Sequence, residues 1–146
     1  MQVKKIRPAR RADLGQVIQI DAGITGIAKP AYWSDVLKRH GVRGAPRFFL
    51  ISETGRALQG YIVGEVRDWE FGQPPCGWVF GIGVRPKARL AGVGTQLLEA
   101  MCARFRGRGV DRVRTLLARD NALVLAFFRS QGMMAAPFIA LEKGLD

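Results

Sequence analysis

The 146-residue chain carries 23 lysine and arginine residues against 12 aspartate and glutamate residues, for a formal net charge of +11, and 48% of its residues are hydrophobic. This composition excludes a disordered chain and fits one compact domain with its own core. No apolar run is long enough to cross a bilayer and the opening segment, 1–7, is too polar for a secretory signal, so we expect a cytoplasmic protein with no membrane partner.

Neither the basic charge nor the two cysteines identify a single class of binding partner. A positive field attracts nucleic acid, anionic membrane or a phosphorylated cofactor, but the arginines are scattered through the chain. A nucleic-acid-binding module would need clustered basic residues with exposed aromatic residues, or a recognised motif, and the sequence has neither. Cys76 and Cys102 fit neither a disulfide framework nor a metal motif, so we expect no metal.

Hydrophobic periodicity predicts alternating strands and helices in the first half of the chain. In chain order the expected elements are a strand over 3–7, a helix that opens at Asp13, a loop over 23–30, a helix over 32–40, and strands over 47–53 and 58–67. In the last of these strands Tyr61, Val63 and Glu65 face the same way, because side chains alternate along a strand.

The second half of the chain predicts the same alternation. Its expected elements are a strand over 78–84, a helix over 93–106, a strand over 110–117, a helix over 121–131 capped by Asp120, and a final strand over 137–143. Alternation puts the large side chains of the first of these strands on one face, namely Trp78, Phe80, Ile82 and Val84. Together the elements predict a mixed α/β sheet with helices on both faces.

The segment from Ile82 to Thr95 takes the chain from a strand, through a glycine-containing turn, directly into a helix. Unpaired backbone N–H groups and the positive end of a helix dipole then meet at one point, which binds phosphate without a dedicated side chain. Gly92 and Gly94 keep Cβ atoms away from that point. Neither the Gly-Lys-Ser/Thr of a Walker loop nor the third glycine of a dinucleotide fold follows. The alternative is an ordinary turn whose glycines serve chain geometry alone.

The spacing Arg89-x-x-Gly92-x-Gly94, after a strand that ends Val84-x-Pro86, resembles the acetyl-CoA loop of the GNAT superfamily of N-acetyltransferases. That family's loop has the pattern Gln/Arg-x-x-Gly-x-Gly/Ala. The order of strand, loop and helix is also the same.

A second segment resembles the same family. There an asparagine opens a helix, with an aromatic residue seven positions later and a glycine eleven positions later, and this chain has Asn121, Phe128 and Gly132 at those places. The alternative for Phe128 is simple core packing. The resemblance covers the last two-thirds of the chain, and the first 45 residues match mainly in the order of their elements.

The resemblance implies a single domain over residues 1–146 of the α/β (α+β) class, with a GNAT-like mixed, largely antiparallel twisted sheet and helices on both faces. It also implies acetyl-CoA as cosubstrate, an amine-bearing small molecule or protein as acceptor, and direct transfer without a metal. The residues assigned to acetyl-CoA are Ile82 and Val84 for the pantetheine arm, Leu90, Ala91, Gly92, Val93, Gly94 and Thr95 for the pyrophosphate, and Asn121 and Phe128 beside the arm. Nearby basic residues are candidates for the adenosine phosphates, namely Arg85, Lys87, Arg89 and Arg129.

The chain departs from the family pattern at the acid and the base. Phe128 stands where many members have a tyrosine that protonates the thiolate, and Leu116 stands where others have a glutamate base. Glu65 is the candidate replacement base, with Tyr61 on the same face, and the alternative for Glu65 is a solvated charge. By analogy with the family, Tyr32 and Trp33 are expected to shape the acceptor pocket, although Trp33 also suits the core.

The missing base favours an acceptor amine of low pKa. A lysine amine near pKa 10.4 costs about 4.6 kcal/mol to deprotonate at pH 7, whereas an α-amine near 7.8 costs about 1 kcal/mol. A GNAT-like CoA sensor without catalysis is the rival hypothesis. The identity of the acceptor, an acyl group larger than acetyl, and a homodimer all remain open at this point.

Overall fold

The computed structural model describes residues 4–146, which form two compact units, Met1–Leu116 and Leu117–Asp146. Val3, where the sequence predicts the first strand to begin, lies outside the described residues. No helix within residues 4–146 combines the length and the apolar character that a membrane span needs.

The first unit is built on a five-stranded sheet, counted over its described residues. The strands lie in chain order and are β1 (Lys4–Pro8), β2 (Arg47–Thr54), β3 (Ala57–Arg67), β4 (Cys76–Val84) and β5 (Val113–Thr115). The first four pair antiparallel, and β5 pairs parallel to β4. The prediction of a mixed, largely antiparallel sheet is therefore confirmed.

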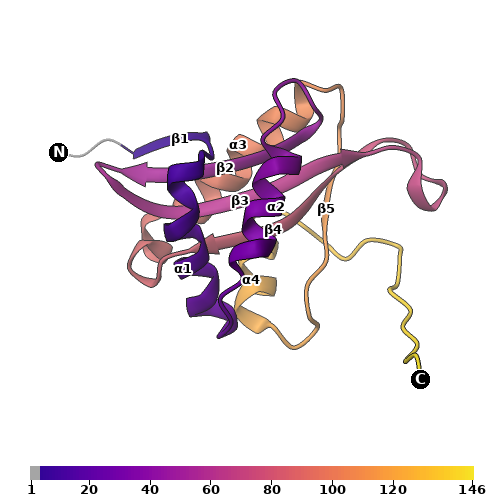
Figure 1. Ribbon diagram of the computed structural model, residues 1–146. Helices are drawn as coiled ribbons and strands as arrows, with labels where there is room; N and C mark the ends of the chain where they lie inside the picture. Colours follow the sequence, from indigo (N-terminus) through magenta and orange to yellow (C-terminus); the bar gives the residue numbers. More distant parts are fainter. Residues whose placement is uncertain (1–3) are drawn as a thin grey trace. The chain divides into compact units, whose positions relative to one another are not determined.

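Helices cover both faces of this sheet, as the sequence predicted. Helices α1 (Leu14–Thr25) and α2 (Pro30–His40) lie in front of the sheet in Figure 1, and α3 (Val93–Arg106) lies behind it. Within residues 4–146, short 3₁₀ helices interrupt the connections, namely η1 (Arg11–Asp13), η2 (Glu70–Gly72) and η3 (Pro86–Ala91).

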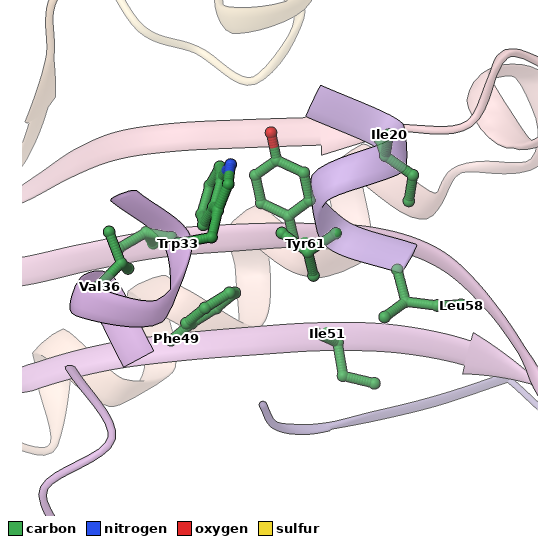
Figure 2. Packing of buried hydrophobic residues seen from close by; sticks show 9 residues of the cluster. Ile20, Trp33, Val36, Phe49, Ile51, Leu58 and Tyr61 are labelled. Atoms are coloured by element: carbon green, nitrogen blue, oxygen red, sulfur yellow. The ribbon is translucent and has the colours of Figure 1, made fainter. Parts of the chain in front are cut away.

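The core in front of the sheet consists of side chains from α1, α2 and alternate positions of β2 and β3. Its members are all buried, namely Val17, Ile20, Trp33, Val36, Phe49, Ile51, Leu58, Tyr61 and Val63. Figure 2 shows Trp33 of α2 packed beside Tyr61 of β3, and their ring centroids lie 4.9 Å apart in an edge-to-face arrangement. Burial of these large apolar side chains supplies the main driving force that holds α1 and α2 on the sheet.

Helix α3 packs closely on the rear face because glycines there leave room for its side chains. A Cβ on Gly64 of β3 would lie 3.1 Å from both Met101 and Phe105 of α3. A Cβ on Gly77 of β4 would overlap the Phe105 ring. Glycine inside a strand is costly unless another element approaches the backbone, as α3 does here.

A β-bulge in β4 changes which side chains share a face. Gly81 pairs with Val63, and the next pair is Val79 with Gly64, so Phe80 is an extra residue in β4. Strict alternation along β4 is therefore wrong at this point. The residues that share the rear face are Val79, Ile82 and Val84, because they pair with Gly64, Ile62 and Gly60. Trp78, Gly81 and Gly83 face α1 and α2 instead, across from Glu65, Val63 and Tyr61.

Strand β5 is shorter than the predicted strand over 110–117. It pairs with β4 only over Gly77–Val79, so no described strand of this unit covers the outer edge of β4 from Phe80 to Val84. The outer edge of β4 is therefore open after Val79.

The second unit contains one described helix, α4 (Ala122–Ser130). Asn121, and not the predicted Asp120, caps it, because Asn121 Oδ1 accepts a hydrogen bond from the main-chain N–H of Val124 at 3.2 Å. The predicted strand over 137–143 is wrong, since residues 133–146 adopt no regular structure. A strand needs a partner backbone, and residues 117–146 contain no other strand to pair with.

Candidate functional site

The predicted phosphate loop forms at the junction of β4, η3 and α3. After β4 ends at Val84, η3 carries the chain around to Gly92, whose φ of +79° lies in the left-handed region, and α3 begins at Val93. A Cβ on Gly92 would meet nothing within 4 Å. Gly92 is therefore required by its backbone conformation, and the space in front of it is open.

The first turn of α3 directs main-chain N–H groups toward that open space. Its first helical hydrogen bond runs from Gln96 N to Gly92 O at 3.1 Å, so the N–H groups of Val93 and Gly94 precede the helical pattern. The N-cap residue, Gly92, has no side chain to cap this end, and the first turn holds no acidic residue. No carboxylate of the first turn therefore offsets the positive end of the α3 dipole, which favours an anion there.

Two basic side chains donate hydrogen bonds to main-chain oxygens at this junction, and only one of these two donors was a candidate from the sequence. Lys4 Nζ donates to Ala91 O at 2.5 Å, and Arg89 Nε donates to Val84 O at 3.4 Å. Arg85 instead braces the fold, because its guanidinium donates to Leu58 O at 2.6 Å and to Gln16 Oε1 at 3.1 Å. No periodic pattern marks Lys4, which reaches the loop only because β1 lies in the same sheet.

The open edge of β4 carries the main-chain groups predicted to meet a pantetheine arm. Arg85 N donates to Gln59 O of β3 at 2.9 Å, so its main chain points toward β3. Because main-chain direction alternates along a strand, Ile82 and Val84 direct their N–H and C=O groups to the other side, the open edge. An extended ligand can add to such an edge like an extra strand.

Tyr61 covers the inner face of β4 beside this edge. A Cβ on Gly83 would lie 2.5 Å from Tyr61 Cε1 and 2.7 Å from the hydroxyl oxygen, so glycine is what lets the ring lie across β4. Tyr61 is only 3% exposed. Burial, together with the charges of Asp21 and Tyr32, raises the pKa of Tyr61 well above its usual range, so the hydroxyl stays protonated at neutral pH.

Glu65 lies on the same face of β3 as Tyr61 but at a different part of it. Four residues of extended strand separate them by about 13 Å, so one reacting group cannot contact both. Arg47 Nε lies 3.3 Å from Glu65 Oε2, and the Glu65 side chain is 20% exposed. The structure therefore leaves two distinct candidate positions for proton transfer.

His40 was not a candidate from the sequence, yet it lies near Glu65. It is 7% exposed and ends α2, with Nδ1 3.3 Å from Val36 O, while Nε2 is buried with no hydrogen-bond partner among the described residues. Its ring centroid lies 6.5 Å from that of Phe80. Burial lowers the pKa of His40, although the charge of Glu65 opposes that change.

A buried acid, Asp21 of α1, was also missed as a functional residue. Its carboxylate oxygen Oδ2 accepts a hydrogen bond from Trp33 Nε1 at 3.0 Å and pairs with Lys29 Nζ at 3.0 Å. The one sequence signal was an aspartate four residues after Val17 on the apolar face of its helix, where charge is unexpected.

The remaining residues that the sequence predicted for the site lie in the loop, at the surface or within the second unit. Leu90, Ala91 and Gly92 are exposed at the tip of the loop, Thr95 is half-buried, and Leu116 is exposed. Asn121 caps α4, and the Phe128 ring packs against Phe127 with centroids 5.1 Å apart, both within the second unit. No group of three or more metal-binding side chains occurs among residues 4–146.

The comparisons with known proteins point to one family. The model described as "Acetyltransferase (GNAT) family" matches residues 15–133. Among curated sequences nothing matches this chain.

Three solved structures share the fold at low sequence identity. An aminoglycoside N-acetyltransferase, AAC(6')-Iy, in complex with CoA is 15% identical, with a TM-score of 0.85 over 99% of this chain and 96% of its own. A transcriptional regulator from Bacillus halodurans C-125 is 18% identical, with a TM-score of 0.82 over 98% and 100%. The aminoglycoside 6'-N-acetyltransferase AAC(6')-IG from Acinetobacter haemolyticus is 20% identical, with a TM-score of 0.80 over 97% and 99%.

Proposed function

Because the chain belongs to the GNAT family of acetyltransferases, we propose that it transfers an acetyl group from acetyl-CoA directly to the nitrogen of an amine. The observation that carries the proposal is the continuous path from the open β4 edge to the uncapped start of α3. An edge that accepts an extended arm and a helix end that accepts a diphosphate suit the two parts of one thioester carrier. One neighbour of the same fold, AAC(6')-Iy, was solved with CoA.

The main chain would hold acetyl-CoA in this proposal. Ile82 and Val84 would pair with the pantetheine arm, and the loop from Leu90 to Thr95 would hold the pyrophosphate. The basic side chains of Lys4 and Arg89 lie on the loop, where they add positive charge. Asn121 and Phe128 remain predicted contacts of the arm on the strength of the family motif alone.

The reaction forms one bond and breaks one. The neutral amine nitrogen attacks the thioester carbonyl carbon, the C–S bond breaks, and the thiolate leaves with the electron pair. The nitrogen passes a proton to a base, and the thiolate takes a proton from a donor side chain, which solvent then reprotonates. Orientation of the two reactants and backbone N–H groups near the developing oxyanion supply the rate gain.

Glu65 is the proposed base, and His40 is proposed as a positioning residue. Burial lowers the pKa of His40 and so favours its neutral form at pH 7, while the charge of Glu65 opposes that shift. Tyr61 is the proposed proton donor nearer the open edge. Its raised pKa means that its hydroxyl carries a proton throughout the neutral range.

A catalytically silent acetyl-CoA sensor is the second candidate. Two observations favour it. Phe128 and Leu116 replace the acid and the base found in many members, and the Glu65 carboxylate already pairs with Arg47. Such a protein would bind acetyl-CoA and release no free CoA with any amine.

Binding is tested by thermal melting with acetyl-CoA. A ligand at a hundredfold excess over its dissociation constant stabilises the fold by about 2.7 kcal/mol, which raises the melting temperature by several degrees. We expect Gly92→Glu to abolish this gain, since it places bulk and negative charge at the helix start. Gly109→Glu is the matched control, because Gly109 also has a positive φ, +77°, and open space around its Cβ, at the far end of α3. Equal gains in the two variants would contradict the proposed loop.

Catalysis is tested by thiol release from acetyl-CoA over a panel of amines. Acetylation of at least one amine, lost in Gly92→Glu and kept in Gly109→Glu, supports the enzyme. Binding without thiol release for any amine supports the sensor.

A further inference from the structure

The ammonium group of Lys29 pairs with a buried carboxylate, that of Asp21, beside the face of β4 that is turned toward α1 and α2. Asp21 is 6% exposed, and its Oδ2 contacts both the Lys29 ammonium and the Trp33 indole N–H at 3.0 Å. Lys29 comes from the short connection between α1 and α2, and its side chain is 36% exposed. The carboxylate is fixed in the core, whereas its cation reaches it from the surface.

Aromatic rings surround this ion pair. The Lys29 ammonium lies 5.9 Å from the ring centroid of Tyr32, and the Tyr32 and Trp33 rings meet edge to face at 5.1 Å. Trp33 in turn packs on Tyr61 at 4.9 Å. A carboxylate beside the faces of aromatic rings is a site that favours an organic ammonium, through charge and through cation–π attraction.

Tyr61 links this site to the reaction region. The charge of Asp21 raises the pKa of the Tyr61 hydroxyl, and that hydroxyl lies over Gly83 of β4. In Figure 2 the Trp33 indole nitrogen and the Tyr61 hydroxyl point in the same direction, away from Ile51. The ammonium site and the inner face of the open β4 edge therefore lie next to the same ring.

A buried carboxylate does not activate an amine nucleophile that it contacts directly. An opposite charge at 3 Å favours the protonated form of the amine, whereas attack on a thioester needs the neutral form. A single amine cannot be held as an ammonium and react as a free base at once. An ammonium at Asp21 is thus an anchor rather than the reacting group.

We propose that Asp21 is the anchor for a second, non-reacting ammonium of a di- or polyamine acceptor, and that this acceptor must displace Lys29 to bind. The proposal rests on the proposed acetyl transfer and names its acceptor class. Lys29 then acts as an internal competitor, a built-in occupant of the acceptor site.

The test compares each α,ω-diamine from 1,3-diaminopropane to 1,6-diaminohexane with the n-alkylamine of equal length. In the unaltered protein we expect kcat/KM for the best diamine to exceed that of its monoamine by about tenfold or more, the worth of a charged hydrogen bond. Asp21→Asn should remove most of this preference through a higher KM for the diamine. Lys29→Met should act in the opposite direction and lower the diamine KM.

If the Asp21–Lys29 pair only stabilised the fold, Asp21→Asn and Lys29→Met would both lower the free energy of unfolding. Neither substitution would then lower a KM. Asp35→Asn is the matched control, since Asp35 pairs with Arg39 at 3.1 Å on the exposed face of α2 and loses a similar contact. It should leave both KM values unchanged.

A binding measurement separates this inference from the proposed reaction. Calorimetric titration of the same diamines into the protein without acetyl-CoA should show binding that Asp21→Asn weakens and Lys29→Met strengthens. If that pattern appears but no amine is acetylated, the ammonium site stands and acetyl transfer fails. Acetylation of monoamines as readily as diamines, with Asp21→Asn and Lys29→Met unchanged, would overturn the ammonium site and leave acetyl transfer intact.

Discussion

Three buried polar residues have properties that the composition of the chain does not indicate. His40, Asp21 and Tyr61 all lie on the face of the sheet that packs against α1 and α2, and each is less than 10% exposed. Burial shifts the pKa of Tyr61 upward and that of His40 downward, and both shifts favour the neutral form. The negative charge beside these two groups comes from Asp21 and Glu65, which pair with Lys29 and Arg47.

His40 should lower the stability of the folded protein at acidic pH. Its pKa in the folded state lies below 6.5, the value of an unperturbed histidine, so the unfolded chain takes up a proton first as the pH falls. The free energy of unfolding should therefore decrease below about pH 6.5, by at most about 1.4 kcal/mol per pH unit from this group. Glu65 moderates the effect, and Arg39 and Arg47 increase it.

His40→Leu isolates that contribution, because His40 is the only histidine in the chain. Urea unfolding of both proteins between pH 8 and pH 5 is the measurement. The free-energy difference between them should shift in favour of the variant as the pH falls. A difference that stays constant with pH would show that the histidine titrates normally in the fold.

At the scale of the element, β4 is the strand on which the site depends. Its bulge at Phe80 rotates the strand, so that Gly81 and Gly83 face Tyr61 while Ile82 and Val84 face α3. Its pairing with β5 ends at Val79, which opens the edge where Ile82 and Val84 direct their main-chain groups. In the proposed function, this one strand would supply a face for the acceptor and an edge for the thioester carrier.

The two glycines of β4 should respond differently to the same substitution. Gly83→Ala places a Cβ 2.5 Å from the Tyr61 ring, so the ring must move, at a cost of about 1–3 kcal/mol. At Gly81 the nearest Tyr61 atom is 4.0 Å from the new Cβ, an ordinary contact. We expect Gly83→Ala to lower the unfolding free energy and any acetyltransferase activity, with Gly81→Ala close to the unaltered protein.

Chemical denaturation with activity assays on both variants checks this contrast. Equal effects of the two substitutions would mean that the Tyr61 ring does not depend on the glycine beneath it.

At the scale of the whole molecule, the net charge of +11 and the two compact units are the main features. The GNAT family model spans residues 15–133 and so crosses the boundary between the units at Leu116 and Leu117. On that ground we propose that residues 1–146 act as a single acetyltransferase domain. The positive charge then serves to attract an anionic carrier rather than to bind nucleic acid.

Calorimetry tests the single domain. A single cooperative domain of this size should melt in one transition, with equal calorimetric and van't Hoff enthalpies, and acetyl-CoA should move that transition as a whole. Two separable transitions, of which acetyl-CoA moves only one, would contradict the proposal.

Most of the elements, the sheet class and the glycine turn before α3 could be predicted from the sequence alone. These follow from local signals: the apolar run of β2, the alternation within β3, the apolar stripe of α3, and a glycine at position 92 that allows a positive φ before a helix start. Such signals act over a few residues, so a single sequence contains them. Over 137–143 the local pattern predicted a strand that does not form, because a strand also needs a partner backbone, which a local pattern does not supply.

Only the tertiary structure decided which polar residues meet. Asp21 and Lys29 are eight positions apart and join across a helix end, Lys4 reaches the Gly92 loop from another strand, and His40 approaches Glu65 from the opposite end of α2. The bulge at Phe80 likewise arises from pairing with β3. These contacts depend on how helices pack on a sheet, and no local periodicity encodes that geometry.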